Sequence, residues 1–246
     1  MEYRLRAMEL WFQHLPGSML IEIETEHLSK WLASTRGEHL LQIGGPSNLQ
    51  MVKQAHFAHK IYLSTQFISS SHAACMQSSL EALPILPGSV DVVVLAHMLE
   101  FAESPQQLLQ EIHHSLAPNG QLLIMTFNPY SQWGMSRFSR GKRGFPWSGH
   151  FYSQCKIKKW LRQIGYSIIS NKTLCYRPTL HDAHQCQRLK FMESIGQVCF
   201  PWFGAVTFVA AQKKEIAMTP IKAKWWERKI KVGSTYAEPT TRVNHE

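Results

Sequence analysis

The sequence predicts an α/β protein with a mostly parallel sheet, and three observations carry that prediction. Short apolar runs typical of buried strands recur along the chain, and amphipathic helical patterns lie between them. The clearest run, Ser89–Ala96, is followed by a helix-start pattern of Ser104, Pro105 and Gln107. Strands that alternate with helices in this way indicate βαβ units. Such sheets bind ligands beyond the carboxyl ends of their strands, so we expect the functional site there.

The individual elements follow from local patterns. Apolar runs bounded by turn residues predict strands at 39–43, 60–64, 89–96, 121–127, 166–174 and 205–211. Helical spacing predicts helices at 18–34, 104–116, 153–164 and, as an insert between the last two strands, 179–196. Those last two strands are expected to form a hairpin-like pair around the insert. Residues 128–150 hold four glycines and predict a long irregular loop, which is usually functional or mobile.

The 246 residues are sufficient for one core of about 200 residues with appendages. We expect an N-terminal helical lid at 1–37, a core domain at 38–212 with an insert at 179–200, and a basic tail at 213–246. No apolar stretch is long enough to span a bilayer, and no leader pattern is seen. The five cysteines form no CxxC pair, which argues against a disulfide framework or a zinc ribbon and predicts a cytoplasmic protein.

The acidic residues exclude several classes of chemistry. Among 17 of them, only Asp91 and Asp182 are aspartates, which argues against two-metal phosphoryl transfer, aspartic protease dyads and EF-hands. Metal ligation is also not expected. His181, His184 and Cys186 have helix-compatible spacing, but no second cluster completes a site.

Charge is distributed unevenly along the chain. Residues 1–130 carry 6 Lys and Arg against 11 acids, whereas residues 131–246 carry 20 against 6, a net charge of +14. This asymmetry predicts an anionic partner for the second half, such as nucleic acid, a phosphorylated metabolite or a membrane surface. A solvated basic surface that only maintains solubility is an equally simple explanation.

One run of motifs resembles a known family. The segments are Leu83-Pro84, Ser89–Val93, Leu99, Leu109–Ile112 and Leu116–Gly120. In this order and spacing they look like the fourth strand, its helix and the fifth strand of class I S-adenosylmethionine-dependent methyltransferases of type 11. The "HLLQIGG" of the first strand, the "FNP" after the fifth strand and the basic tail are similar to a proteobacterial branch. The resemblance spans about residues 38–212. It implies a Rossmann-like, seven-stranded, mostly parallel sheet with helices on both faces, methyl transfer, and S-adenosyl-L-methionine as cofactor.

The cofactor loop of that family differs here. The family has an acidic residue and then three glycines at alternate positions, because glycine permits close approach of the backbone to the cofactor. This chain has Gln42 at the acidic position and Gly44, Pro46 and Asn48 at the glycine positions, with Gly45 between the first two. The resemblance therefore assigns cofactor contacts to Gly44 and Gly45.

Two further carboxylates of the family are missing. The second strand normally ends in an acid that binds the ribose hydroxyls, but residues 60–66 contain none, and Ser64 or Thr65 stands near that place. The family aspartate that contacts the adenine amine corresponds to Ser79. We expect Ser64 and Ser79 to contact the cofactor through weaker neutral hydrogen bonds.

The resemblance places two polar residues near the reaction. His97 follows the fourth strand and is expected to orient the cofactor or to accept a proton; its alternative is a packed, hydrogen-bonded histidine. Asn128 ends the fifth strand and is a candidate for substrate contact; its alternative is a turn residue that ends the strand. Glu100 is the nearest carboxylate after His97.

The acceptor is expected to be an anion bound by the basic residues of the 128–150 stretch, which are Arg137, Arg140, Lys142 and Arg143. A second hypothesis belongs to another class. In this hypothesis the chain is a methyltransferase-fold binding module that has lost catalysis, and it binds nucleic acid or another anionic partner through its basic half. Cofactor binding distinguishes the two.

Overall fold

The computed structural model describes residues 2–45, 50–53, 55–65, 74–140, 149–178, 188–189 and 191–214. Its strands are β1 His39–Gly44, β2 His59–Ser64, β3 Ala74–Gln77, β4 Val90–Ala96, β5 Leu116–Phe127, β6 Tyr166–Leu174 and β7 Val206–Lys213. Its helices are α1 Glu2–Gln13, α2 Gly17–Ala33, the short 3-10 helix η1 Gln50–Val52, α3 Pro105–Ser115, α4 Gln132–Arg140, α5 Gln154–Ile164 and α7 Phe191–Cys199. Residues Met1–Glu215 form one compact unit.

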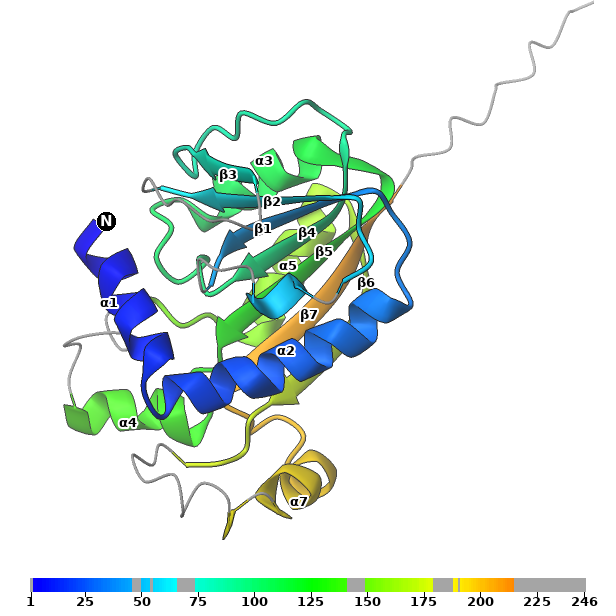
Figure 1. The fold of residues 1–246 in the computed structure, drawn as a ribbon. Coiled ribbons are helices and arrows are strands. Elements are labelled where there is room, and N and C mark those ends of the chain that lie inside the picture. Colours follow the sequence, from blue (N-terminus) through cyan, green and yellow to red (C-terminus); the bar gives the residue numbers. More distant parts are fainter. Residues whose placement is uncertain are drawn as a thin grey trace, which may run out of the picture. The chain divides into compact units, whose positions relative to one another are not determined.

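The strands form one seven-stranded sheet in the order β3-β2-β1-β4-β5-β7-β6 (Figure 1). Strands β1 to β5 pair in parallel, and β7 lies antiparallel between β5 and β6. The predicted mostly parallel sheet and its closing antiparallel pair are therefore confirmed. The chain proceeds from β1 outward to β3 and then returns to place β4 on the other side of β1. This reversal creates a switch point between β1 and β4, where sheets of this kind bind ligands.

Helices cover both faces of the sheet, as predicted. Helix α2 packs on one face, where the Trp31 indole donates a hydrogen bond to Gln121 Oε1 at 3.0 Å and contacts the Phe208 ring edge-on. Helices α3 and α5 contact each other on the opposite face (Figure 1). Helix α5 begins and ends where the sequence predicts, because Ser153 Oγ accepts a hydrogen bond from Lys156 N and Gly165 adopts a left-handed conformation.

Asp91, the second residue of β4, holds β4 in register with β1. Asp91 interrupts the apolar run of β4, and its Oδ2 accepts hydrogen bonds from the backbone amides of Glu38 at 2.8 Å and His39 at 3.0 Å. These bonds tie the start of β4 to the start of β1. The two strands then end together, with Gly44 paired to Ala96.

The prediction of an irregular stretch over residues 128–150 is wrong for its first half, which contains helix α4. Ser131 Oγ accepts a hydrogen bond from Gly134 N at 3.0 Å, so Ser131 caps the helix. Trp133 is fully buried, and its indole donates to Arg177 O at 2.8 Å. The glycines indicated a loop, whereas the cap and this buried tryptophan stabilise a helix.

Three other elements differ from expectation. Helix α1 precedes the first predicted helix and buries Met8 and Phe12, which were not recognised as an apolar face. Strand β3 has only four residues and lacks a strong apolar pattern. Within the predicted helical insert the structure describes α7, which extends to Cys199, beyond the predicted end at 196, while residues 179–187 and 190 lie outside the described part of the chain. No helix in the described part of the chain is long and apolar enough to cross a membrane.

Candidate functional site

The turn after β1 requires glycine at two successive positions. Gly44 and Gly45 have φ angles of 75° and 71°, in the left-handed region that side chains disfavour. A Cβ at Gly44 would overlap the Met98 side chain and lie 2.6 Å from Ala96 O. The carboxyl end of β1 therefore closes tightly against the end of β4, at the switch point of the sheet.

Neutral side chains hold this turn where the resemblance leads us to expect an acid. Gln42 is fully buried, and its Nε2 donates a hydrogen bond to Gly44 O at 2.9 Å. The Tyr62 hydroxyl donates to Gly45 O at 3.3 Å from β2. The glutamine thus fixes the backbone of the glycine turn from inside the sheet.

A polar pocket of about 640 Å³ lies at the carboxyl ends of β2 and β3, within the range of small-molecule sites. Two hydrogen bonds between the strand ends fix its shape, one from the backbone Ser78 N to Ser64 O at 3.0 Å and one from the side-chain Gln77 Nε2 to Thr65 O at 3.4 Å. The residues that line it are Thr65, Gln77, Ser78, Ser79, Leu80, Glu81 and Glu103. Predicted residue Ser79 thus lies in the pocket, while Ser64 is buried behind it.

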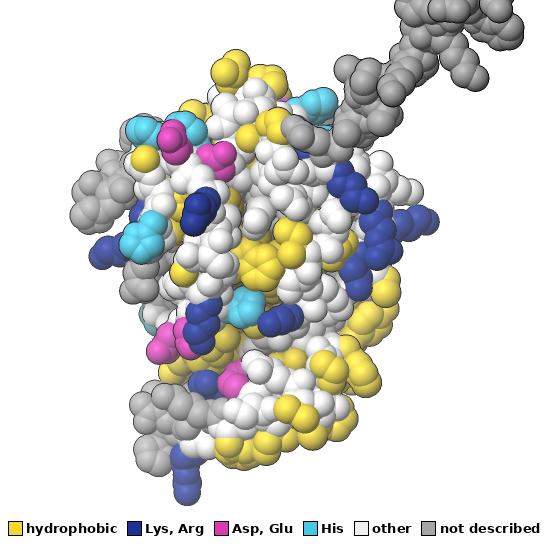
Figure 2. All heavy atoms as spheres, turned by 90° about the vertical axis from the view of Figure 1, so that its right-hand side faces the viewer, with side chains coloured by type: hydrophobic (Ala, Val, Ile, Leu, Met, Phe, Trp, Pro, Cys, Tyr) yellow, Lys and Arg dark blue, Asp and Glu magenta, His cyan; other side chains and the backbone are white. Residues whose placement is uncertain are grey.

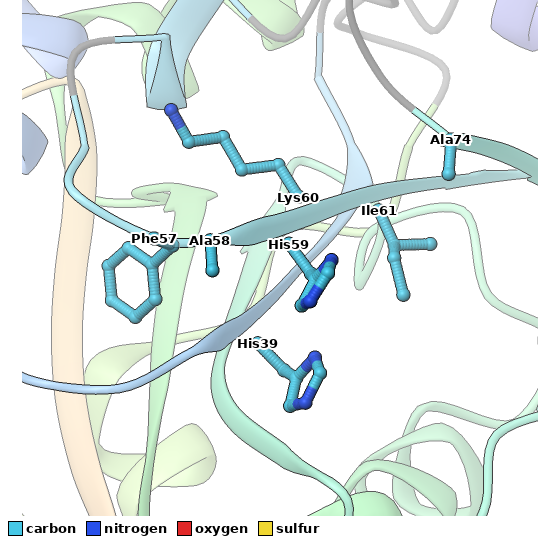
Figure 3. A pocket seen from close by; sticks show the side chains of 7 residues that line it. All are labelled: His39, Phe57, Ala58, His59, Lys60, Ile61 and Ala74. Atoms are coloured by element: carbon cyan, nitrogen blue, oxygen red, sulfur yellow. The ribbon is translucent and has the colours of Figure 1, made fainter.

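A second hollow of about 680 Å³ lies at the opposite end of the strands (Figure 3). It is lined by residues at the amino ends of β1 and β2, where the rings of His39 and His59 stack with their centroids 5.0 Å apart. Parallel α/β sheets bind their ligands at the carboxyl ends of the strands. The smaller pocket at the carboxyl ends of β2 and β3 is therefore the better candidate, despite the larger volume at this end.

A buried ion-pair network lies at the end of β4. His97 has a φ of 52°, and its side chain is fully buried between Glu24 of α2 and Glu100. His97 Nε2 lies 2.8 Å from Glu24 Oε1, and Nδ1 lies 3.6 Å from Glu100 Oε1. Glu100 Oε1 also accepts a hydrogen bond from Phe127 N at 2.7 Å. The network therefore joins α2 to the ends of β4 and β5.

The network keeps His97 protonated at neutral pH. Burial alone would lower the pKa of His97, but the carboxylates of Glu24 and Glu100 raise that pKa to about 10. Because the ring already carries its proton, it is poorly suited to accept another one from an acceptor molecule. Its bonds favour a positioning role, and direct contact of His97 with a cofactor stays a prediction.

Aromatic rings enclose this network. The Phe12 and Phe127 rings lie 5.6 and 4.4 Å from the His97 ring, measured between centroids. Trp11 contacts Phe127 and Trp133 edge-on, and Phe151 stacks on Phe127. Helix α1 thus brings two aromatic side chains to the carboxyl edge of the sheet, which supports a covering role for the N-terminal helices.

Comparison with known proteins agrees with this geometry. Residues 28–124 match the family described as "Methyltransferase domain". A S-adenosylmethionine-dependent methyltransferase of Thermotoga maritima has the same fold with a TM-score of 0.61 and 14% sequence identity, over 87% of this chain and 97% of that one. The family match lies within residues 28–124, and the sheet as a whole has the fold of S-adenosylmethionine-dependent methyltransferases. The resemblance seen in the sequence is thereby confirmed.

Two curated relatives extend the comparison. "Uncharacterized protein YafS" of Escherichia coli K12 is 24% identical over 234 residues, which cover 93% of this chain and 92% of that protein. The ubiquinone/menaquinone biosynthesis C-methyltransferase UbiE of Roseobacter denitrificans is 25% identical over 119 residues, which cover 42% and 48% of the two chains. The first of these similarities extends over nearly the whole length of the chain.

Asn128 is engaged in bonds within this methyltransferase fold. It is buried, and its Nδ2 donates to Trp202 O at 2.7 Å and to Gly204 O at 3.0 Å. Its Oδ1 accepts a hydrogen bond from Tyr130 N at 3.1 Å. Both amide hydrogens are thus used to join the end of β5 to the segment before β7. This pattern favours the turn-residue alternative, and substrate contact by Asn128 stays a prediction.

The predicted basic residues lie at the limit of the described structure. Arg137 and Arg140 belong to the last turns of α4, where only the backbone is described. Lys142 and Arg143 lie outside the described residues, as do Pro46 and Asn48 of the cofactor loop. Their role in binding an anionic acceptor therefore stays a prediction.

Sequence reasoning missed two carboxylates of this region. Glu24 lies four residues from both Leu20 and Leu28, so it interrupts the apolar side of a predicted helix, and that interruption indicates a buried partner. Glu103 directly precedes the cap of α3, at the carboxyl edge of β4, and lines the polar pocket. Its place after a predicted strand could have drawn attention to it.

Proposed function

We propose that this chain binds S-adenosylmethionine at the carboxyl ends of β1 to β4 and transfers its methyl group to an acceptor that carries an anionic group. One observation carries the proposal. The left-handed Gly44–Gly45 turn, where a side chain at Gly44 would collide with Met98, lies at the switch point of a methyltransferase sheet. The polar pocket at the ends of β2 and β3 lies along the same edge.

The residues of this edge fit the cofactor chemically. Gly44 and Gly45 are buried, and Met98 and Ala96 occupy the space that their side chains would need, so the glycines let the end of β1 turn closely against the end of β4 at the proposed site. Gln77 and Ser79 offer neutral donors and acceptors for ribose hydroxyls and for the adenine amine. Glu103 adds a carboxylate to the same pocket, although β2 lacks the usual one. Hydrogen bonds to that carboxylate are stronger than neutral ones.

When bound, S-adenosylmethionine supplies a methyl group that is already strongly electrophilic. The protein's task is therefore alignment, and a base is needed only for acceptors that hold a proton at neutral pH. The protonated His97, fixed between Glu24 and Glu100, positions the end of β4 against α2. The surrounding Phe12, Phe127 and other aromatic rings exclude water from that end.

Calorimetric titration with S-adenosylmethionine and with S-adenosylhomocysteine tests the proposal. We expect binding at micromolar to sub-millimolar affinity. Ser79→Trp fills the polar pocket from an exposed position and should weaken binding by about tenfold or more, a loss of about 1.4 kcal/mol or more.

Leu86→Trp provides the matched control, because it introduces the same large side chain at an exposed site outside the pocket. We expect this variant to bind both ligands as the wild type does. Equal binding by wild type and Ser79→Trp would show that the cofactor does not use this pocket.

The missing carboxylates favour one alternative, a methyltransferase-fold module that binds an anionic partner without catalysis. The Gln42 side chain is bonded to the turn, and Ser64 or Thr65 stands near the place of the acid at the end of β2. A hydrogen bond to a charged group contributes about 1.5–3 kcal/mol, so loss of the ribose acid weakens binding by about one to two orders of magnitude. Absence of calorimetric binding up to millimolar ligand, in folded protein, would favour this alternative.

Replacement of Arg140, Lys142 and Arg143 by alanine tests the anionic acceptor. With radiolabelled S-adenosylmethionine and a metabolite extract as the source of acceptors, we expect methyl transfer to fall by about tenfold or more, because charge-assisted contacts are lost. Affinity for S-adenosylhomocysteine should not change. The exposed residues Lys159, Arg162 and Lys172 provide a charge-matched control that should retain transfer. Full activity of the first variant would contradict the role of this segment.

A further inference from the structure

Helix α7 turns an apolar stripe toward solvent. Phe191, Ile195 and Val198 are spaced at i, i+4 and i+7, which places them on one helical face, and all three are exposed. Val198 exposes 82% of its surface. A helix of a monomeric domain normally turns its apolar stripe toward the core, whereas α7 turns its stripe toward solvent.

The inner side of α7 shows why the helix is oriented in this way. Gly196 is buried against the Tyr176 ring, where a Cβ would overlap the ring atoms. Glu193 accepts a hydrogen bond from Tyr176 N, and its Oε1 lies 3.2 Å from Arg177 Nε. Because a glycine contact and a half-buried ion pair fix this inner side, the apolar stripe is held outward by specific contacts.

The segment after α7 continues the exposed apolar surface. Phe203 N donates to Phe200 O at 2.9 Å, and Trp202 O accepts from buried Asn128, so this segment has a defined backbone. Hydrophobic side chains gather along the lower end of the molecule in Figure 2, where α7 lies in Figure 1. We call this surface the α7 patch, and its members are Phe191, Ile195, Val198, Phe200, Trp202 and Phe203.

The chain around the α7 patch is cationic. Glu193 is the only carboxylate in residues 149–178 and 191–214, and it is paired with Arg177. Arg188 precedes α7, and the exposed Lys172 lies on β6, the strand that α7 contacts, whereas Lys213 and Lys214 lie at the opposite end of β7. An apolar, aromatic-rich surface with basic neighbours is complementary to a lipid bilayer, because the bilayer has an apolar interior and can carry anionic headgroups.

The α7 patch is small for a protein interface. Stable interfaces use about 20–30 residues on each side, whereas this patch has six large apolar side chains. Nucleic acid is matched by charge but offers no apolar layer to cover the patch. Insertion into the boundary between lipid headgroups and acyl chains needs only a few such side chains with basic neighbours.

We propose that the α7 patch binds the surface of an anionic phospholipid bilayer, with its aromatic and aliphatic side chains inserted at the headgroup boundary. The membrane is touched from one side, and no spanning segment is involved. Asn128 links the patch directly to the end of β5, so the bound bilayer lies close to the carboxyl end of that strand. This proposal is independent of methyl transfer.

Cosedimentation with vesicles tests the proposal on the full chain. Vesicles of phosphatidylcholine with phosphatidylglycerol should bind the protein, and vesicles of phosphatidylcholine alone should bind it more weakly. The triple variant Val198→Ser, Phe200→Ser and Trp202→Ser should lower the partition coefficient by about tenfold or more, because apolar insertion is lost. Circular dichroism and thermal unfolding establish that the variant is folded.

Leu86→Ser is the matched control, because Leu86 is a single apolar side chain, 75% exposed, between β3 and β4. This variant should sediment as the wild type does. The proposal is overturned if the wild type does not bind anionic vesicles at low salt, or if the triple variant binds as well as the wild type. A wild-type dimer that ignores vesicles and becomes a monomer in the triple variant would instead identify a second copy as the occupant.

Discussion

Glu24→Gln is expected to lower the free energy of unfolding by about 3–5 kcal/mol, because it leaves the buried His97 imidazolium without its closest carboxylate. Both groups are fully buried and their charged atoms lie 2.8 Å apart. Glu100 would then be the remaining carboxylate, at a longer distance of 3.6 Å from Nδ1, and the Phe12 and Phe127 rings offer the charge no comparable partner. Urea unfolding, followed by circular dichroism, measures the change through the shift in midpoint.

Glu26→Gln is the control on the same helix. Glu26 pairs with Lys30 at 2.6 Å, but about 70% of both side chains is exposed. Solvent screens such pairs, so their loss costs only about 0–1 kcal/mol. Similar midpoints for the two variants would show that the ion pair between Glu24 and His97 contributes little to stability.

The same network predicts how stability depends on pH. The pKa of His97 is raised from its ordinary value of 6.5 to about 10 in the folded protein. The contribution of the protonated His97 to stability is therefore complete below pH 6.5 and is lost as the pH rises through 10. Between these limits this single group makes stability fall with a slope of up to about 1.4 kcal/mol per pH unit.

Glu24→Gln and His97→Gln should flatten this alkaline decline, whereas Glu26→Gln should leave it unchanged. Urea midpoints measured at intervals between pH 6 and pH 10 provide the comparison. An equally steep decline in His97→Gln would assign the pH dependence to other groups.

The sheet was predictable because its central elements carry strong local patterns. The run of valines with the single Asp91 and the helix-start pattern that follows agree with the buried strand β4 and with α3 in the structure, although Ser104 makes no side-chain cap hydrogen bond. Cap and stop residues likewise located α5. The position of β4 beside β1 followed from the family resemblance, because local patterns contain no information on strand order.

Other features depend on contacts between distant parts of the chain. Glu24 and His97 are 73 positions apart, so nothing local pairs them. Trp133 stabilises α4 through a bond to Arg177, 44 positions away, and a local pattern of glycines could not show it. Of the polar residues chosen near the cofactor, Ser79 lies in the polar pocket, while Asn128 is bonded to backbone groups. Position after a strand locates a residue at the edge of the sheet but does not give its side-chain partners.

At Gly44 the surrounding atoms predict how much stability a substitution would cost. Gly44→Ala is expected to cost about 2–5 kcal/mol of stability, since about 1–2 kcal/mol arises from the left-handed backbone and about 1–3 kcal/mol from overpacking. The added Cβ would collide with Met98 and with Ala96 O, both at the end of β4. Because that collision displaces the turn at the proposed cofactor site, S-adenosylhomocysteine binding should also be lost.

Gly88→Ala separates the two contributions. Gly88 has a φ of 69°, close to the 75° of Gly44, but a Cβ there would meet no atom within 4 Å. This variant should therefore lose only the backbone contribution of about 1–2 kcal/mol and retain ligand binding. Urea midpoints and calorimetry on the pair make the comparison. If both variants lose the same stability, Met98 moves aside at no cost, and close packing between the ends of β1 and β4 does not explain the glycine at position 44.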